Sequence, residues 1–305
     1  MTSKPRIERY AAFADDPASG NPAGVVLDAG SLSAPDMQRI AAQVGYSETA
    51  FVTGPIIPAG PDDTIGTVDA DGGPARVASS IPIRYFAPEG EVDFCGHATI
   101  ATAVSIGEHH GLGDYVLSTR VGPVTITARR DGTHSVGALR SPPVDCFPLD
   151  DRLLTQLLDA LHWSKQDLDP DLPPAIGFGG NRHPVLVARE LGRLEDLSYD
   201  FDALQRLSRQ HDWITVQLVV ATGPGSWRAR DPFPWGGVVE DPATGAAAAA
   251  FAGYLRAESR ATAGETFVIT QGVEMGRPSR IEVELTEDAA IVSGTAARIH
   301  GSDDR

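Results

Sequence analysis

Two segments of the chain share one design, and they constrain the fold more than any other feature. Residues 83–103 read IRYFAPEGEVDFCGHATIATA, and residues 238–255 read VVEDPATGAAAAAFAGYL. In each, a short polar turn runs directly into an Ala-rich apolar segment that predicts a helix. A helix begins with unpaired backbone N–H groups and the positive end of its dipole, and this combination binds carboxylate or phosphate. The pair therefore predicts two similar lobes that close on one small anionic substrate.

Length and charge narrow the class of protein. A chain of 305 residues is long for a single core and predicts two domains. Its formal net charge is −16, from 25 basic and 41 acidic residues. Nucleic acids and anionic membranes both require basic patches, so neither is an expected partner. A small anion stays compatible with this charge, because a local cluster of N–H donors can override the global field.

The cysteines and the apolar runs indicate the cellular compartment of the protein. Cys95 and Cys146 are the two cysteines, and the sequence has no CxxC and no Cys/His pair at the usual spacing of metal ligands. This pattern argues against a disulfide framework and favours a reducing compartment. The N-terminal residues lack the apolar core of a signal peptide, and no apolar run reaches 18 residues. We expect a cytoplasmic protein.

The order of predicted elements indicates the fold class. Apolar periodicity and turn residues predict more strands than helices, and the helices do not alternate with strands as regular crossovers. The pattern favours an α+β architecture over a doubly wound sheet. Helices are expected over 35–44, with Ser33 as N-cap, and over 98–108, 150–161, 200–210 and 246–258; strands are expected over 6–13, 24–28, 46–52, 81–86, 115–119, 123–129, 134–140, 213–221, 281–285 and 289–299; and 223–237 is expected to be a loop.

Three side chains are candidates for acid/base chemistry, and each has a structural alternative. Glu48 lies in an otherwise apolar strand, where a desolvated carboxylate suits proton transfer, although a solvent-facing strand position would also explain it. His97 opens the first helix and is either a substrate donor or a packed helix cap. Asp241 precedes Pro242 in the second turn and is either functional or a plain N-cap.

Cys95 has its own alternatives. A helix N-terminus and His97 would activate it as a thiolate base or nucleophile, and a Cys-His-Asp hydrolase would use it in that way. A small buried apolar residue is the structural alternative, and the family pattern described next favours it.

The motifs together resemble the PhzF-like family, which is named for the phenazine-biosynthesis isomerase and is related to diaminopimelate epimerase. They stand in the family order and cover nearly the whole chain. The motifs are Gly20-Asn21-Pro22, Ser47-Glu48-Thr49-Ala50-Phe51-Val52, Arg84-Tyr85-Phe86, Cys95-Gly96-His97-Ala98-Thr99, Asn181-Arg182-His183, Val239-Glu240-Asp241 through Thr244-Gly245, and Gln271 through Pro278. Any one of them is weak, but the ordered set is specific.

The resemblance implies a fold and a division into domains. Each of two lobes would be a strongly curved, mostly antiparallel sheet wrapped around one central helix, as in diaminopimelate epimerase. We expect an N-terminal lobe over 1–118, to which 288–305 return, and a C-terminal lobe over 119–287. The active site is expected in the cleft between the lobes.

The resemblance also implies roles for residues. Glu48 matches the catalytic glutamate that shuttles a proton, and His97 and Asp241 match the histidine and aspartate that face it. The carboxylate of a small substrate would lie on the N–H groups around Gly96–His97 and Gly245–Ala246, with Asn21 and Cys95 as further contacts. The family implies a homodimer and neither a metal nor an organic cofactor. The expected reaction moves a proton and a double bond.

Two departures from related patterns keep alternatives open. Two-thiol racemases of this fold use one cysteine from each lobe, but no cysteine follows Cys146 here. The phenazine enzyme carries a serine directly after the second Thr-Gly, where this chain has Ala246. The alternatives to an isomerase are a cofactor-independent epimerase, a Cys-His-Asp hydrolase and a non-catalytic ligand-binding protein on the same scaffold.

Overall fold

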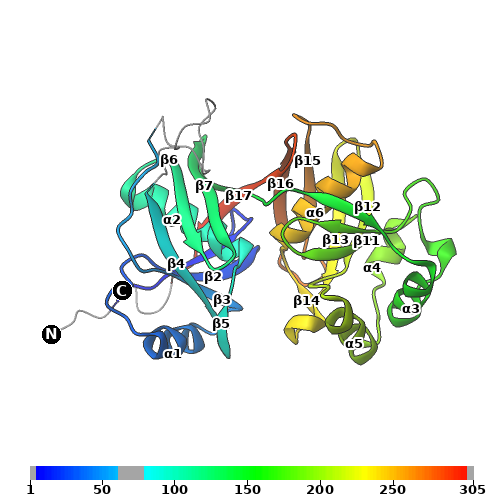
Figure 1. Cartoon of the computed structure of the whole chain (residues 1–305), viewed down its shortest axis with the longest axis horizontal. Coiled ribbons are helices and arrows are strands. Elements are labelled where there is room, and N and C mark those ends of the chain that lie inside the picture. The colour runs from blue at the N-terminus through cyan, green and yellow to red at the C-terminus, as the bar shows by residue number, and fades with distance from the viewer. Residues whose placement is uncertain (1–4, 61–78, 301–305) are drawn as a thin grey trace. The chain divides into compact units, whose positions relative to one another are not determined.

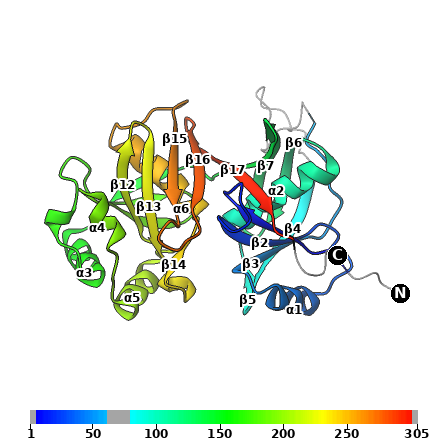
Figure 2. The same cartoon turned by 180° about the vertical axis from the view of Figure 1, so that it is seen from behind.

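The chain divides into two compact units. The structure, a computed structural model, describes residues 5–60 and 79–300. Unit 1 comprises Met1–Arg140 with Ser293–Arg305, and unit 2 comprises Ser141–Val292. Figures 1 and 2 show that each unit is built mainly of strands around one long helix. The predicted α+β class is confirmed.

Unit 1 extends further along the chain than the predicted boundary at residue 118. The strands β6 (Gly113–Thr119), β7 (Gly122–Asp131) and β8 (His134–Arg140) form a continuous antiparallel meander. Successive hairpins keep these strands in one sheet, so the division falls after β8 and not before β7. The last strand, β17 (Ala290–Arg298), pairs with β1 (Glu8–Ala12) and returns the chain to unit 1.

The remaining elements of unit 1 surround its long helix, α2 (Gly96–His110). They are β2 (Asn21–Val26), α1 (Ala34–Val44), β3 (Glu48–Val52), β4 (Ser80–Ala87) and β5 (Gly90–Val92). Helix α1 begins as predicted, with the Ser33 hydroxyl accepting a hydrogen bond from the Asp36 N–H.

Unit 2 has a corresponding long helix, α6 (Gly245–Ala257). Its strands are β9 (Asp145–Pro148), β10 (Ala175–Phe178), β11 (Arg182–Val187), β12 (Gln217–Gly223), β13 (Ser226–Pro232), β14 (Glu240–Asp241), β15 (Thr266–Gln271) and β16 (Ser279–Leu285). Its other helices are α3 (Asp151–Leu161), α4 (Leu191–Glu195) and α5 (Phe201–His211), with short 3-10 turns at Lys165–Asp167 and Pro234–Gly236.

The two units repeat one strand topology. In unit 1, β1 and β2 are antiparallel, β2 and β3 parallel, β3, β4 and β5 antiparallel in turn, β4 and β6 parallel, and β6 and β7 antiparallel. In unit 2, β10 to β16 repeat these pairings one for one. The long helix follows the fifth strand in both units. The duplication read from the two turn–helix segments therefore extends to the whole of each unit.

Small residues explain how a sheet closes around each helix. A Cβ atom added to Gly137 in β8 would lie 2.6 Å from the Ile100 carbonyl oxygen of α2. A Cβ added to Gly177 in β10 would lie 2.7 Å from the Ala250 carbonyl oxygen of α6. The sheet backbone thus approaches the helix backbone directly, which requires glycine on the strand and small side chains on the helix. Both helices are buried on nearly every face, which fits their sequences of small and apolar residues with few charges.

The expected loop over 223–237 is wrong in its first half, because Ser226–Pro232 form β13. This strand contains two arginines and an aspartate, so its sequence indicated an exposed segment. Arg228 and Arg230 are balanced by Glu274 and Glu240, so a charged sequence fits an interior strand. The preceding strand also begins later than predicted, at Gln217 instead of residue 213.

In the two described ranges, none of the helices combines the length and the apolar character needed to cross a membrane.

Candidate active site

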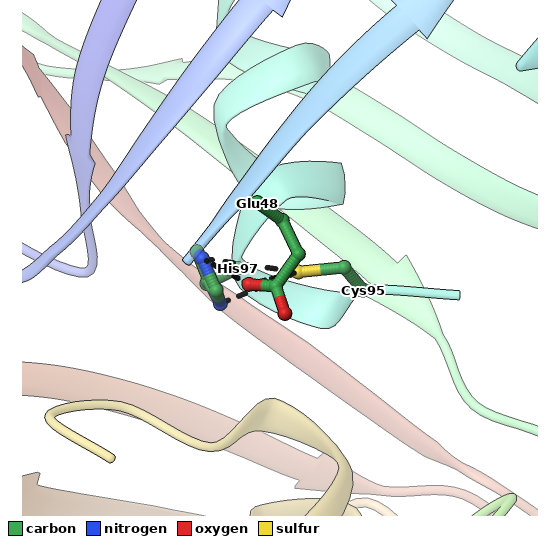
Figure 3. A group of neighbouring side chains, drawn as sticks. All are labelled: Glu48, Cys95 and His97. Atoms are coloured by element: carbon green, nitrogen blue, oxygen red, sulfur yellow. Dashed lines mark hydrogen bonds and ion pairs between the residues drawn. The ribbon is translucent and has the colours of Figure 1, made fainter. Parts of the chain in front are cut away.

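The candidate site in unit 1 is built where β3 begins and α2 begins. Glu48 is the first residue of β3, and its side chain is 17% exposed. Cys95 is the N-cap of α2 in an extended conformation, with φ −144° and ψ 116°, and Gly96 and His97 form the first turn. The extended N-cap turns the chain from β5 into the helix and brings the Cys95 and His97 side chains toward Glu48 (Figure 3).

The His97 imidazole is buried and hydrogen-bonded at both ring nitrogens. Its Nδ1 lies 3.2 Å from the Asn21 amide nitrogen, and its Nε2 lies 3.3 Å from the Ser47 hydroxyl. The Glu48 carboxylate lies 3.4 Å from Nε2. Burial lowers the pKa of His97, and the nearby Glu48 carboxylate offsets this only in part. The imidazole is therefore neutral near pH 7.

Cys95 completes a three-residue cluster. Its Sγ lies 3.5 Å from Glu48 Oε2 and 3.4 Å from His97 Nδ1. The sulfur and the carboxylate lie on the same side of the imidazole (Figure 3). Cys95 is thus in direct contact with both Glu48 and His97.

This cluster has the chemistry needed for proton transfer on carbon. A carboxylate base stands beside a neutral imidazole and a thiol, in a mostly buried setting at a helix N-terminus. Partial exclusion of water strengthens electrostatic interactions there, and the helix dipole favours a bound anion. The donor atoms of Glu48, Cys95 and His97 also lie within 4.8 Å of one another, which is close enough for a metal ion.

The turn before α6 in unit 2 is arranged differently. The Thr244 hydroxyl donates to Asp241 Oδ2 at 2.6 Å. The Gln271 amide donates to the Asp241 carbonyl oxygen at 2.7 Å and to Thr244 Oγ1 at 3.0 Å, and its oxygen accepts from the Thr244 N–H at 3.2 Å. Asp241 therefore anchors the turn, and Gly245 and Ala246 follow as the first helical residues.

A matching ion pair fixes the turn in each unit. Arg84 of β4 binds Glu91 of β5 through two hydrogen bonds of 2.7 and 2.6 Å. Arg230 of β13 binds Glu240 of β14 in the same bidentate way, at 3.0 and 2.6 Å. Bidentate guanidinium–carboxylate pairs hold both partners in one geometry. Each pair therefore fixes the hairpin that leads into the long helix.

The pairs also set a residue-by-residue correspondence between the units. The spacing from Glu91 to Gly96 equals the spacing from Glu240 to Gly245, so Cys95 corresponds to Thr244 and His97 to Ala246. In the adjacent strands Phe51 pairs with Arg84 and Leu218 pairs with Arg230. Glu48 lies three positions before Phe51, and Thr215 lies three positions before Leu218. Thr215 is therefore the counterpart of Glu48. All three members of the unit 1 cluster thus have non-ionisable counterparts at described positions of unit 2.

Thr215 belongs to a buried polar chain that sequence reasoning missed. Its hydroxyl lies 2.9 Å from His183 Nδ1 and donates to Asp231 Oδ1 at 2.8 Å. Burial lowers the pKa of His183 to about 3 and raises the pKa of Asp231 well above its ordinary value. His183 is therefore neutral near pH 7, and burial favours the protonated form of Asp231. His183 stands in a quoted motif, but no feature of the sequence linked it to Thr215 or Asp231.

The structure groups the predicted site residues by unit. Glu48, Cys95 and His97 contact one another in unit 1, Asn21 contacts His97, and Gly96 lies between Cys95 and His97 in the chain. Asp241, Gly245 and Ala246 stand together at the start of α6 in unit 2. Ser47 and Gln271 were within quoted motifs without a predicted role. Their contacts with His97 and with the Asp241 turn make them part of the two sets.

Comparison with known proteins agrees with this arrangement. Residues 10–301 match the model of the PhzC-PhzF family, described as phenazine biosynthesis-like protein. The chain is 34% identical over 268 residues to the trans-2,3-dihydro-3-hydroxyanthranilate isomerase of Pseudomonas chlororaphis, which covers 88% of this chain and 86% of that protein.

Solved structures show the same fold. A PhzF-family phenazine biosynthesis protein from Bacillus anthracis superposes with a TM-score of 0.79 at 24% identity, covering 96% of each chain. A probable proline racemase from Agrobacterium radiobacter K84 superposes with a TM-score of 0.59 at 14% identity, covering 96% of this chain and 91% of the other. At these identities the two structures bear on the fold alone.

Together, the duplicated α+β units, the acid/base cluster and the sequence match define the protein as an isomerase. The chain belongs to the PhzC-PhzF, phenazine biosynthesis-like family, and the predicted family resemblance is confirmed.

Proposed function

We propose that the protein is a cofactor-independent isomerase that moves a proton and a double bond on a small carboxylate substrate. The observation that carries the proposal is the asymmetry between the duplicated units. Unit 1 holds a carboxylate, an imidazole and a thiol in contact, whereas the corresponding positions of unit 2 hold Thr215, Ala246 and Thr244. A single such cluster in the described part of the chain favours one base that removes a proton and returns it.

In the proposed reaction Glu48 is the base. Its carboxylate takes a proton from a carbon atom of the substrate, the electron pair shifts through the adjacent double bond, and the same carboxylic acid returns the proton to another carbon. Atoms and charge balance without a cofactor. A neutral His97 suits this role of Glu48, because an imidazolium at 3.4 Å would hold the carboxylate as an ion pair and weaken it as a base.

Asn21 and Ser47 would position the imidazole. With the Asn21 amide nitrogen donating to Nδ1, the ring proton lies on Nε2, the nitrogen that faces Ser47 and Glu48. His97 then has a fixed tautomer and presents an N–H donor on the side of the carboxylate. We assign it the stabilisation of charge that develops on the substrate.

The substrate-holding roles rest on the helix N-termini. Among the described residues, neither N-cap side chain, that of Cys95 or that of Thr244, makes a capping hydrogen bond with a backbone N–H of its helix. We assign the N–H groups around Gly96 and around Gly245–Ala246 to the substrate carboxylate. Asp241 is assigned to substrate contact through the turn that it anchors. Cytoplasmic location, a homodimer and independence from cofactors stay predictions.

The substrate class follows from the relatives. The named substrate of the Pseudomonas chlororaphis isomerase is a dihydro-hydroxyanthranilate, which is a small cyclic amino carboxylate. At 34% identity the same class is the first candidate here. Ala246 argues for a related compound instead of the identical one, because a methyl group provides no hydroxyl contact.

A cofactor-independent epimerase is the nearest alternative. It requires a second base on the opposite face of the carbon, and the unit 2 counterparts of Glu48, Cys95 and His97 cannot take a proton near neutral pH. Asp241 or His97 would have to serve. The Asp241 carboxylate already accepts from Thr244, and His97 lies 3.4 Å from Glu48, beside the first base. The asymmetry therefore favours the isomerase.

Proton NMR in D₂O tests the proposal. The protein is incubated with trans-2,3-dihydro-3-hydroxyanthranilate and with other small cyclic and amino carboxylates. Isomerisation or deuterium uptake at carbon is expected for wild type and for Glu89→Gln, a matched change at an exposed glutamate. Glu48→Gln should lose it. Carbon exchange that persists in Glu48→Gln, or ligand binding without exchange in wild type across the panel, would refute the proposed function.

A further inference from the structure

The unit 1 cluster also has the composition of a metal site. A thiol, an imidazole and a carboxylate are the three donor types that zinc prefers, and catalytic or open zinc sites use three protein ligands with a fourth position left to water or substrate. Cys95 and His97 are at least nine-tenths buried, and the Glu48 side chain is 17% exposed. The spacing Cys-x-His in the sequence is not a usual metal motif, and the third donor comes from a strand 47 residues earlier.

The distances between donor atoms match a tetrahedral site. With ordinary zinc–ligand bond lengths and tetrahedral angles, nitrogen and oxygen ligands lie about 3.4 Å apart, and sulfur lies about 3.6 Å from either. Here Nε2 of His97 lies 3.4 Å from Oε2 of Glu48. Sγ of Cys95 lies 3.5 Å from that oxygen and 3.8 Å from Nε2. The three donor atoms therefore already have the separations of the site, whereas the His97 ring, whose Nδ1 lies 3.4 Å from Sγ, is not yet oriented for it.

The imidazole must turn for its nitrogen to point at the shared centre. Figure 3 shows the sulfur and the carboxylate on one side of the ring. Rotation about the Cβ–Cγ bond, which is a soft torsion, redirects Nε2 while displacing it little. The rotation gives up the contact with Ser47, whereas the Asn21 amide, turned to present its oxygen, accepts the proton of Nδ1. A hydrogen bond of this kind orients most metal-bound histidines.

Charge balance favours a divalent ion in this setting. When the ion binds, the Cys95 thiol loses its proton to solvent, and thiolate and carboxylate together carry two negative charges. A divalent cation neutralises them, so the largely buried cluster gains no net charge. Harder ions such as Mg²⁺ prefer oxygen ligands and an octahedral shell, which this donor set does not offer.

We propose that Glu48, Cys95 and His97 form a binding site for a thiophilic divalent ion, with Zn²⁺ as the matching ion. The bound ion takes the lone pair with which Glu48 would accept a proton from carbon. Zinc would therefore act as a reversible inhibitor of the chemistry, removed by a chelator. The inhibitory consequence rests on the proposed function, whereas the metal site itself does not.

Metal titration of the full-length protein tests the site without any substrate. Co²⁺ is added to the metal-free protein and followed by its visible and near-ultraviolet absorption, and Zn²⁺ is then added in competition with a chromophoric chelator. We expect one ion per chain and a thiolate-to-cobalt charge-transfer band. Cys95→Ala should remove the band and weaken Zn²⁺ binding by more than about 100-fold, beyond the loss typical of an outer-shell change.

Cys146→Ala is the matched control, because it removes the other cysteine and leaves the cluster intact. It should bind Co²⁺ and Zn²⁺ as wild type does. Cys95→Ser, which keeps the side-chain size, serves if Cys95→Ala does not fold, and it should also lose the band. Equal Zn²⁺ affinity in wild type and either Cys95 variant, or a band lost in Cys146→Ala, would overturn the site.

The two proposals fail separately. Tight Zn²⁺ binding with no proton exchange on any carboxylate would leave the metal site standing and refute the isomerase. Wild-type exchange that is lost in Glu48→Gln, with no specific metal binding, would support the isomerase and refute the metal site.

Discussion

The starts of α2 and α6 have the same backbone frame and different side-chain chemistry. Each follows a hairpin that is fixed by a bidentate arginine–glutamate pair, and each helix is buried against glycine-containing strands. At α2 the frame presents a carboxylate, an imidazole and a thiol to one another. At α6 the equivalent places hold threonine and alanine, and the polar groups bond among themselves.

The difference indicates a division of labour after duplication. A frame that places backbone N–H groups at a helix start is useful in both units, because each start can hold an anionic group. An acid/base cluster is needed once if one base both removes and returns the proton. Unit 2 then has no requirement for ionisable groups at those positions, and the buried His183 and Asp231, whose charged forms burial disfavours, are consistent with a holding role.

The largest expected effect separates Glu48 from its counterpart. Glu48→Gln should lower the rate of proton exchange by about 10³-fold, because the amide cannot take a proton. Thr215→Val, at the corresponding position of unit 2, should leave the rate within about tenfold, although loss of its buried hydrogen bonds should cost about 1–3 kcal/mol of stability. NMR measures the exchange rates of the two variants, and urea unfolding measures their stabilities. Equal rate losses would remove the functional distinction between the units.

The next effect compares the two ion pairs. The Arg230–Glu240 side chains are 10% and 4% exposed, whereas those of Arg84–Glu91 are 33% and 14% exposed. Arg230→Met leaves a buried carboxylate unpaired and should destabilise the protein by about 3–5 kcal/mol. Arg84→Met should cost about 1 kcal/mol, because Glu91 keeps its ion pair with Arg120 at 2.8 Å. Chemical denaturation of the two variants gives the ranking, and a reversed order would contradict the assignment of the stronger anchor to unit 2.

A smaller effect concerns the pH dependence of stability and the buried His183–Thr215–Asp231 hydrogen bonds of unit 2. His183 has a pKa of about 3 in the fold, so between pH 3 and 6.5 the unfolded chain binds the extra proton and stability rises with pH. The pKa of Asp231 is raised in the fold, so above its ordinary value of 3.8 the folded chain holds the extra proton and stability falls as pH rises. The two contributions oppose each other, while buried His97 adds to that of His183.

Single substitutions should expose the opposing slopes. Relative to wild type, Asp231→Asn should make stability rise more steeply between pH 5 and 6.5, whereas His183→Gln should make it rise less or fall. The His183 contribution across that window is about 2 kcal/mol. Urea unfolding at several pH values measures both slopes. Parallel shifts with unchanged slopes would mean that the pKa of neither group is shifted in the fold.

Sequence reasoning was most effective where local chemistry decides the structure. The Ser33 cap, the two Ala-rich helices and the α+β class all follow from turn residues and apolar periodicity, and they are confirmed. Glu48 and His97 were recognised from residue types at a strand and a helix start. Their contact across 49 positions of the chain came from the family resemblance, because spacing alone does not bring a strand to a helix N-terminus.

Features that depend on tertiary pairing were missed. Strand β13 looked like a loop because its charges are neutralised by Glu240 and Glu274, which are distant in sequence. The His183–Thr215–Asp231 chain joins three separate segments, and no segment signals its partners. The clustering of Cys95 and His97 with Glu48 likewise joins the start of a helix to a strand 47 residues earlier than Cys95.

Isotope transfer tests the single acid/base centre most directly. The substrate carries deuterium at the carbon that loses its proton, and the reaction runs in H₂O with trans-2,3-dihydro-3-hydroxyanthranilate or whichever carboxylate the NMR panel identifies. The account predicts that part of the deuterium reappears at the carbon that gains the proton, because Glu48 carries it between the two. Complete replacement by solvent hydrogen, together with inversion at the starting carbon in recovered substrate, would contradict the account and establish a two-base epimerase.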